Sequence, residues 1–224
     1  MTVGDRLVTP QGGLAELSAH PAQDLTTHHG VVVRLHDDGR IPSDNPWGGG
    51  TDGALRDIYS YGHRNAQGLA FHPETGDLWL SEHGPQGGDE INLVLPGRNY
   101  GWPVVGYGVN YGTGSQIHVG THREGMEPPV HYWRSTLAPS GLLIYMGDRF
   151  PQWRGSMFVG GLSSQALVRL TLTGRIITDE EVLVRNQGRI RDVRQGPDGL
   201  IYLVFEDPGM VARLEPPGGT NNDQ

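Results

Sequence analysis

The sequence contains no cysteine and no lysine. The absence of cysteine excludes disulfides, thiolate nucleophiles and zinc sites with sulfur ligands. The absence of lysine excludes a Walker phosphate-binding lysine and a Schiff base with a substrate. All 17 basic residues are therefore arginines, they form no basic run, and the formal charge is −8. This charge pattern does not predict a nucleic-acid partner.

Long apolar stretches are also missing. No run approaches the ~20 residues that a membrane-spanning helix needs. Met1 leads directly into Thr2 and Val3, without the charged and then apolar segment of a secretory signal. We therefore expect no membrane insertion and no signal peptide in this chain.

Glycine and proline are abundant, with 35 and 16 residues in a chain of 224. Both residues interrupt helices, so this composition indicates strands joined by many tight turns. No segment shows a sustained helical period. We expect an all-β fold in one domain over residues 1–215, followed by a polar, disordered tail over residues 216–224.

A three-residue pattern recurs along the chain. Residues 33–35 (VRL) reappear as residues 168–170 (VRL) and 212–214 (ARL), and the first two copies are each followed by Gly-Arg-Ile. The leucines of the copies are 135 and 44 positions apart. One period of about 45 residues, roughly the length of a four-stranded propeller blade, fits both spacings. The pattern predicts a β-propeller, with accidental similarity inside a β-sandwich as the alternative.

Local patterns are typical of strands and hairpins. In residues 68–80 and 192–203, a turn containing glycine separates two apolar runs. The turn at Asp198 and Gly199 suits a hairpin because glycine accepts a positive φ. Further strands are expected at residues 141–145, 157–160 and 183–185.

Three groups of polar side chains are candidates for chemistry. Arg64 and Asn65 lie in a glycine-flanked loop and offer planar donors to a carboxylate or a quinone oxygen, or they pair structurally. Residues 81–90 are rich in oxygen ligands, which suit calcium, or they form a tight turn with a solvated acidic pair. Arg189 and Arg191 would share one face of a strand, where they clamp an anion or simply lie exposed.

Six short motifs follow one another in the chain and are far more specific together than singly. They are residues 62–68 (GHRNAQG), 82–85 (EHGP), 88–92 (GDEIN), 99–103 (NYGWP), 138–141 (APSG) and 189–192 (RIRD). In order and spacing, they resemble the soluble quinoprotein glucose and aldose sugar dehydrogenases over most of the chain. The resemblance implies a six-bladed β-propeller, incomplete in this chain, that binds pyrroloquinoline quinone (PQQ) and calcium.

The resemblance also implies roles for individual residues. Arg64 and Asn65 would contact the quinone, and Arg189 and Arg191 would pair with the carboxylates of PQQ. The loops around the further cofactor candidates, Tyr111 and Thr136, match the family less closely. The carbonyls of Gly84 and Pro85 would hold the catalytic calcium, and a second, structural calcium would involve Glu90 and Tyr100.

The reaction that the resemblance implies is the oxidation of an aldose at its anomeric hydroxyl to a lactone. Calcium would polarise the quinone, a histidine would remove the hydroxyl proton, and hydride would pass to PQQ. An external electron acceptor would then reoxidise the cofactor. Such enzymes usually work in the periplasm or outside the cell.

The sequence departs from the family pattern in two ways. A lysine that many members place near the cofactor is replaced by Ser163. The catalytic histidine of the family would precede Met1, so we expect an N-terminally truncated chain with little or no activity. Among the histidines present, His63 and His83 lie in matched motifs and are weak candidates for the base. A calcium-dependent lactonase and a non-catalytic propeller that binds a ligand are the alternative functions.

Overall fold

The structure, a computed structural model, describes residues 1–50 and 53–217. Residues 218–224, most of the tail expected to be disordered, lie outside the described residues. The described chain is almost entirely strands and connections, as the composition predicts. The strands are β1 (Thr2–Val3), β2 (Val31–Val33), β3 (Ile58–Tyr61), β4 (Ala66–Phe71), β5 (Leu78–Glu82), β6 (Asp89–Val94), β7 (His131–Trp133), β8 (Pro139–Ile144), β9 (Met157–Gly161), β10 (Ala166–Thr173), β11 (Ile176–Arg185), β12 (Arg189–Gln195), β13 (Ile201–Asp207) and β14 (Met210–Leu214).

Helices are few and short in the described part of the chain. The α-helix α1 (Leu14–Ser18) and two 3₁₀ turns, Pro21–Gln23 and Pro151–Trp153, were not predicted from the sequence. Each spans one turn or little more, which is too short to give a helical period. Within the described residues, no helix has the length and apolar character needed to cross a membrane.

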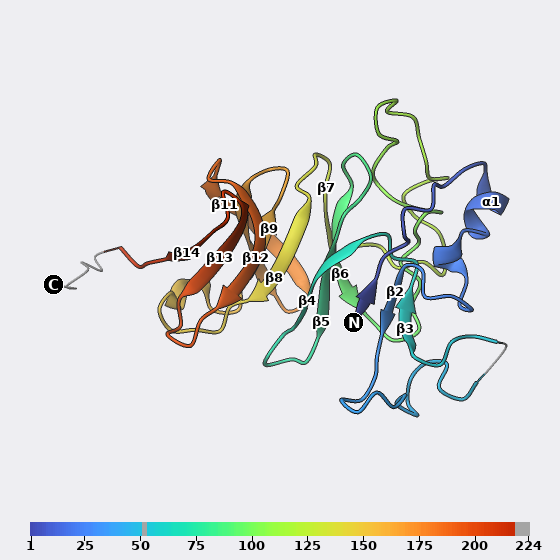
Figure 1. The fold of residues 1–224 in the computed structure, drawn as a ribbon, viewed down its shortest axis with the longest axis horizontal. Helices are drawn as coiled ribbons and strands as arrows, with labels where there is room; N and C mark the ends of the chain where they lie inside the picture. Colours follow the sequence, from blue (N-terminus) through green and yellow to red (C-terminus); the bar gives the residue numbers. More distant parts are fainter. Residues whose placement is uncertain (51–52, 218–224) are drawn as a thin grey trace.

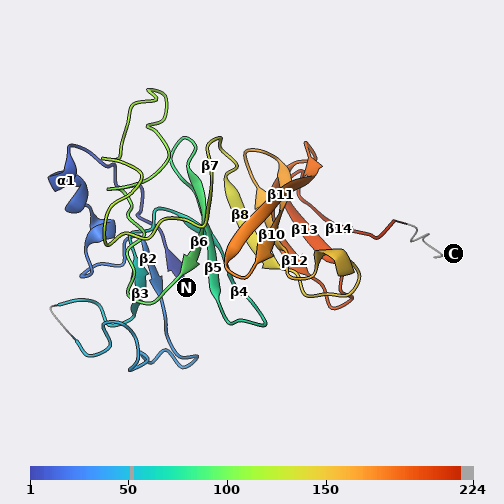
Figure 2. The same ribbon diagram turned by 180° about the vertical axis from the view of Figure 1, so that it is seen from behind.

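The strands form four antiparallel sheets that follow one another along the long axis of the molecule (Figures 1 and 2). In sheet order they are β1-β2-β3, β4-β5-β6-β7, β8-β9-β10-β11 and β12-β13-β14. Each sheet consists of consecutive strands, as in the blades of a propeller. The four sheets do not close into a ring.

The strands β4, β8 and β12 lie side by side, and one buried serine joins their three sheets. The Oγ of Ser140 on β8 lies 2.9 Å from the carbonyl oxygen of Gly160 and 2.6 Å from that of Ile190, so the two carbonyls share its one hydrogen, while the carbonyl of Ser140 accepts from Ser81 Oγ (2.9 Å). The next residue must be small, because a Cβ at Gly141 would lie 2.0 Å from Oδ1 of Asp192. The motif at residues 138–141 is thus a packing junction between sheets.

Neighbouring sheets share apolar cores. Trp79 and Ile91 of the second sheet pack with Met157 and Val168 of the third. A second cluster joins the third and fourth sheets, and a smaller one around Val32 joins the first and second. Burial of this area between successive sheets, rather than within any one of them, is the main stabilising term for such a repeat architecture.

The strands predicted from the sequence are confirmed, but the predicted period of about 45 residues between blades is wrong. The three copies of the repeat lie at or beside equivalent strands: β2 and β10 each pair with the last strand of their sheets, and β14 is the third strand of its own. A period of 45 residues places three blades between residues 35 and 170, whereas the structure has two. Long connections at residues 34–57 and 95–130 make up the difference.

Candidate active site

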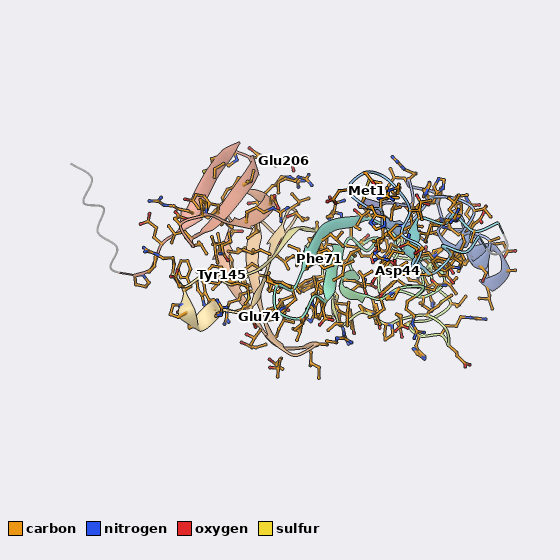
Figure 3. The ribbon with its side chains drawn as sticks, turned by 90° about the horizontal axis from the view of Figure 1, so that it is seen from below. Met1, Asp44, Phe71, Glu74, Tyr145 and Glu206 are labelled. Atoms are coloured by element: carbon orange, nitrogen blue, oxygen red, sulfur yellow. The ribbon has the colours of Figure 1, made fainter. Side chains whose placement is uncertain are left out.

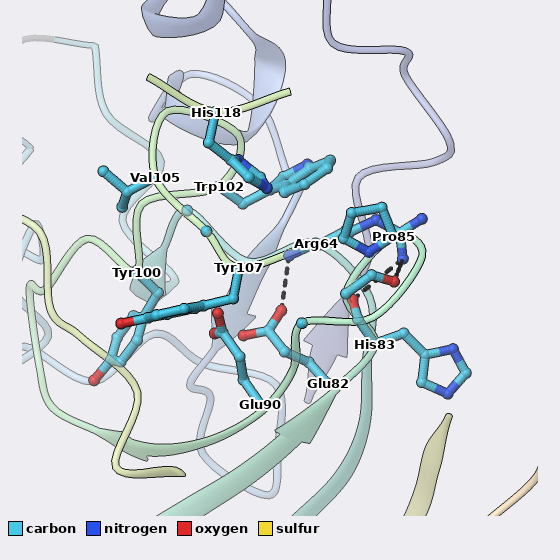
Figure 4. A pocket seen from close by; sticks show the side chains of 14 residues that line it. Arg64, Glu82, His83, Pro85, Glu90, Tyr100, Trp102, Val105, Tyr107 and His118 are labelled. Atoms are coloured by element: carbon cyan, nitrogen blue, oxygen red, sulfur yellow. Dashed lines mark hydrogen bonds between the residues drawn. The ribbon is translucent and has the colours of Figure 1, made fainter. Parts of the chain in front are cut away.

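The connections at one end of the second sheet surround a small cavity. The strand β5 ends at Glu82, which pairs with Ala66 at the start of β4. The loop from β5 to β6, residues 83–88, therefore lies beside the start of β4. The cavity offers about 20 Å³ to the centre of a water molecule, enough for one water or ion. It is lined by Gly62, Arg64, Glu82, His83, Gly84, Pro85, Gly88, Glu90, Tyr100, Trp102, Val105, Gly106, Tyr107 and His118 (Figure 4).

Two carboxylates face this cavity from neighbouring strands. Glu82 and Glu90 are directly paired in the register of β5 and β6, and the Nδ2 of Asn92 donates to both, at 2.8 and 3.1 Å. Burial raises the pKa of the Glu90 carboxyl well above its usual value, and the negative charge of Glu82 raises it further. A cation between these side chains would relieve both effects.

Glu82 is also the anchor of the neighbouring loop. Its carboxylate lies 3.1 Å from Nδ1 of His63 and accepts from the backbone N–H of Arg64 at 2.8 Å. Burial alone would raise the pKa of Glu82, but His63 and the surrounding donors outweigh burial and lower it. Glu82 therefore carries a negative charge inside the protein and fixes the start of the Arg64 loop.

Arg64 points its guanidinium at backbone carbonyls of the opposite loop. Its Nη1 donates to the carbonyl of Gly84 at 2.7 Å and to that of His83 at 3.1 Å. The guanidinium carbon also lies 5.3 Å from the ring centroid of Trp102, a cation–π distance. The carbonyl of Gly84 thus already faces a positive charge, as a calcium ligand would.

The loop that carries Gly84 and Pro85 is held by a buried aspartate. The carboxylate of Asp89 accepts from the N–H groups of Gly84 (2.9 Å), Leu137 (2.7 Å) and Ala138 (2.8 Å). Ala138 has a positive φ of 53°, so these bonds also hold a strained residue in place. Asp89 therefore ties the Gly84 loop to the start of the third sheet.

The other side of the cavity is aromatic. Tyr100 stacks on His63, with ring centroids 4.5 Å apart, and its hydroxyl donates to the carbonyl of Leu93. Burial raises the pKa of the Tyr100 hydroxyl above its usual value, so it remains protonated. Tyr107 stacks on Tyr132 at 3.9 Å and covers the cavity beside Glu90 (Figure 4).

The residues expected to bind calcium lie together. Gly84, Pro85, Glu90 and Tyr100 all line the cavity with Arg64. Among the described residues, no three His, Asp or Glu side chains are grouped as a metal site. A cation here would depend on carbonyl and carboxylate oxygens together, a donor set that suits calcium. The residues present fit the ion.

Three of the residues expected to bind PQQ, Asn65, Arg189 and Arg191, are connected by a chain of contacts outside the cavity. The Nε2 of Gln67 donates to Oδ1 of Asn65 at 2.9 Å, and its Oε1 lies 3.4 Å from Nη1 of Arg191. Arg191 in turn donates to Glu206 at 2.8 Å, and Nε of Arg189 lies 3.7 Å from the same carboxylate oxygen. Asn65 and the arginine pair are therefore connected, although they come from the second and fourth sheets. The planar donors that this row offers suit a flat polycarboxylate.

Three sequence candidates lie apart from the cavity. Tyr111 occupies a turn and is 64% exposed. Thr136 is also exposed, and its Oγ1 accepts from the N–H of Gly87 at 3.0 Å, which links two loops near the site. Ser163, which replaces the family's lysine, is exposed in the connection after β9. The role of Tyr111 and Thr136 in cofactor binding remains a prediction.

Neither histidine of the matched motifs is placed as a general base. His63 is fully buried between Ser60 (2.9 Å) and Glu82. This serine, histidine and carboxylate resemble a hydrolase triad, but Ser60 is itself fully buried and no substrate reaches it. His83 points away from the two carboxylates, with Nε2 2.8 Å from the carbonyl of Pro139, and burial lowers its pKa (Figure 4).

Several residues of the site were not singled out from the sequence. Glu82, Asp89 and Trp102 belong to the matched motifs, so their positions were visible but their contacts were not. Gln67 lies in the first motif, two residues after Asn65, and alternation along β4 was a usable signal. Tyr107, His118 and Glu206 lie outside all motifs, and nothing in the sequence marked them.

The match with a protein family agrees with this geometry. Residues 1–213 match the family described as Glucose / Sorbosone dehydrogenase. The chain belongs to this family. The resemblance inferred from the six motifs is therefore confirmed.

Relatives in the family carry names of sugar dehydrogenases. The aldose sugar dehydrogenase YliI of Escherichia coli is 43% identical over 95% of this chain and 60% of its own length. The quinoprotein glucose dehydrogenase B of Acinetobacter calcoaceticus is 30% identical over 85% of this chain and 51% of its own length. The chain thus spans between half and two thirds of these relatives.

Solved structures show the same fold. A crystal structure of a glucose dehydrogenase, 42% identical, matches 96% of this chain and 60% of its own, with a TM-score of 0.88. The PQQ-bound aldose sugar dehydrogenase of Streptomyces coelicolor is 33% identical and matches 82% of this chain and 48% of its own, with a TM-score of 0.62. The four sheets are therefore consecutive blades of a β-propeller.

Proposed function

We propose that this chain carries the calcium and PQQ sites of a dehydrogenase that oxidises aldose sugars to lactones. The observation that carries the proposal is the convergence of Arg64, Gly84, Pro85, Glu90 and Tyr100 on one cavity. The names of relatives that are quinoproteins or contain PQQ support the choice of cofactor. An external electron acceptor and a small sugar would be the partners. A location outside the cytoplasm, which the resemblance implies, remains a prediction.

In this proposal, calcium would be held by the carbonyls of Gly84 and Pro85, with Glu90 and Tyr100 at a second ion. Because the cavity has room for one ion, the second would lie in the adjoining cavity that Glu90 and Tyr100 also line, and the carboxylates of Glu82 and Glu90 would stabilise positive charge at either position. Calcium would compete with the Arg64 guanidinium for the carbonyl of Gly84, to which Nη1 of Arg64 donates in this structure. Asp89 would keep the Gly84 loop in position in both states.

The cofactor would lie over the row from Arg64 and Asn65 to Arg189 and Arg191, because the cavity itself is too small to hold it. The arginines would bind its carboxylates, and Arg64 and Asn65 would orient its carbonyl oxygens by hydrogen bonds. When bound, PQQ supplies an electrophilic quinone that accepts a hydride. The Nε2 of His83 donates to the carbonyl of Pro139, and its Nδ1 lies 3.5 Å from Nδ2 of Asn65, so both ring nitrogens already have partners and the base is not assigned to this residue.

Titration with PQQ and calcium tests the proposal. Purified protein should acquire the quinone absorbance, in a calcium-dependent way, and turnover would then be measured with glucose and an artificial electron acceptor. A calcium-dependent lactonase would hydrolyse lactones without quinone. A chain that binds calcium but no quinone contradicts the dehydrogenase proposal.

A further inference from the structure

The two arginines expected to bind the cofactor already have a carboxylate partner. Glu206 on β13 accepts from Arg191 at 2.8 Å, and the Nε of Arg189 lies 3.7 Å from the same oxygen. Figure 3 shows Glu206 at the surface of the molecule. One carboxylate therefore serves both guanidinium groups.

The backbone brings these three side chains together. The pairing of β12 with β13 shifts register on both sides of Ile190, so that Arg191 and Glu206 have no direct partner in the ladder. Such a bulge redirects side chains and is common beside functional sites. Alternation along β12 places Arg189 and Arg191 on the same face, and the irregular pairing turns Glu206 toward them. The close contact is thus built into the sheet.

We infer that Glu206 is a resident counter-ion that competes with the carboxylates of an anionic ligand for Arg189 and Arg191. The inference rests on the proposed function, because PQQ is the tricarboxylate that would displace it. Glu206 keeps the two guanidinium groups close together while no ligand is bound. When the ligand binds, Glu206 must lose its contact with one or both arginines.

The exposure of the cluster makes this exchange feasible. The side chains of Arg191 and Glu206 are each 44% exposed, and exposed ion pairs contribute little to stability. A ligand with several carboxylates can contact both arginines at once, which one glutamate does less well. After displacement, the negative charge of Glu206 remains close to a negative ligand and weakens its binding. Glu206 therefore lowers affinity through two additive effects.

The contact between Gln67 on β4 and Arg191 connects the arginine pair to the second sheet. Gln67 bonds to both Asn65 and Arg191, so an arginine released from Glu206 remains tethered beside the quinone-binding side of the site. The length of this link, 3.4 Å at the arginine, leaves room for it to tighten. Glu206 and Gln67 thus contact different nitrogens of Arg191, Nη2 and Nη1 respectively.

The experiment compares PQQ binding by the wild-type chain, Glu206→Gln and a matched control. Glu181→Gln is the control, because the side chain of Glu181 on β11 is 48% exposed, close to the 44% of Glu206, and also pairs with an arginine, Arg169 on β10. Binding is followed by quenching of tryptophan fluorescence at constant ionic strength and calcium. We expect Glu206→Gln to bind about two- to fivefold more tightly, since an exposed ion pair is worth up to ~1 kcal/mol. Glu206→Ala should give the same direction, and melting curves would verify that each variant folds.

The outcomes separate the inference from the proposed function. Tighter binding by both Glu206 variants with an unchanged control supports the inference, since loss of a merely structural residue would weaken binding. Equal or weaker binding by Glu206→Gln overturns the inference and leaves the proposed function standing. If neither the wild-type chain nor the variants bind PQQ, the proposed function fails and the inference fails with it.

Discussion

The first two sheets and the last two differ in what they bury. In the described residues, every buried Asp, Glu or His side chain precedes β7: Asp5, His20, His63, Glu82, Asp89 and His118. The buried polar side chains of the third and fourth sheets are uncharged, namely Ser140, Ser156 and Tyr145, and the strands are joined mainly by short turns around apolar cores. Burying a charge is costly without a partner, so the first half must keep its polar groups paired. We call the first two sheets the reactive half, because they carry most of the candidate site, and the last two sheets the scaffolding half.

The scaffolding half contributes Arg189 and Arg191 to the proposed cofactor site, and the loss of these two side chains should have the largest effect on binding. Replacing both Arg189 and Arg191 by alanine should weaken PQQ binding by about 3–6 kcal/mol, at ~1.5–3 for each charged hydrogen bond. Titration of PQQ against the double variant measures this. Unchanged affinity would mean that the cofactor lies entirely on the first half.

The buried network of the reactive half should be the more sensitive to loss of a single charge. Glu82→Ala would leave His63, the N–H of Arg64 and Asn92 without their partner, at a cost of about 3–5 kcal/mol in the free energy of unfolding. The control Glu181→Ala removes an exposed carboxylate and should cost at most ~1 kcal/mol. Urea denaturation measures the free energy of unfolding of both variants. Similar losses at Glu82 and Glu181 would contradict the proposed difference between the two halves.

The scaffolding half should respond to loss of apolar volume. Leu170 is fully buried, whereas Leu35, at the equivalent position of the sequence repeat, is 41% exposed. Leu170→Ala should lower the free energy of unfolding by about 2–5 kcal/mol through transfer and cavity terms, and Leu35→Ala by much less. Calcium binding should be unchanged in both variants. A loss at Leu35 equal to that at Leu170 would show that the repeat is packed more evenly than the structure indicates.

A small, pH-dependent effect is expected where the two halves meet at their surface. A hydrogen bond from Arg175 lowers the pKa of the Asp77 carboxyl, so the folded state binds this proton less tightly than the unfolded state. The pair therefore stabilises the fold above the unfolded pKa of about 3.9, and this contribution is lost as pH falls through the lower folded value.

Arg175→Gln should thus lower the Tm slightly at pH 7, with the difference from the wild type shrinking below about pH 4. Thermal melting of the two proteins across this range measures it. A difference that grows toward acid pH has the wrong sign for this pair.

The strands and the repeat architecture could be predicted from the sequence because turn residues and apolar alternation are local signals. The number of blades could not be predicted from spacing, since the connections at residues 34–57 and 95–130 differ in length from those of the last two sheets. Loops on a rigid sheet accept insertions at little thermodynamic cost. A fixed period therefore does not predict the number of blades in the half that carries the site.

The site was predictable as far as its motifs reached. Arg64, Gly84, Glu90 and Tyr100 were named from the resemblance, and the structure brings them to one cavity. The contact of Glu206 with Arg191 depends on an irregular strand pairing, which no residue pattern in this sequence signals. Likewise, two of the three bonds to Asp89 come from residues 48 and 49 positions away along the chain, and only the fold reveals them.

The central claim, that the first half is built around a calcium site, is tested most directly by melting the wild-type chain and Glu90→Gln with calcium and with a chelator. At 100 times its Kd, calcium should stabilise the wild type by about 2.7 kcal/mol, which corresponds to about 5–10 °C in Tm. Glu90→Gln should lose most of this shift, and its calcium-free Tm should not fall, because the substitution removes repulsion between Glu82 and Glu90. A wild-type Tm that is the same in calcium and in chelator would contradict the account.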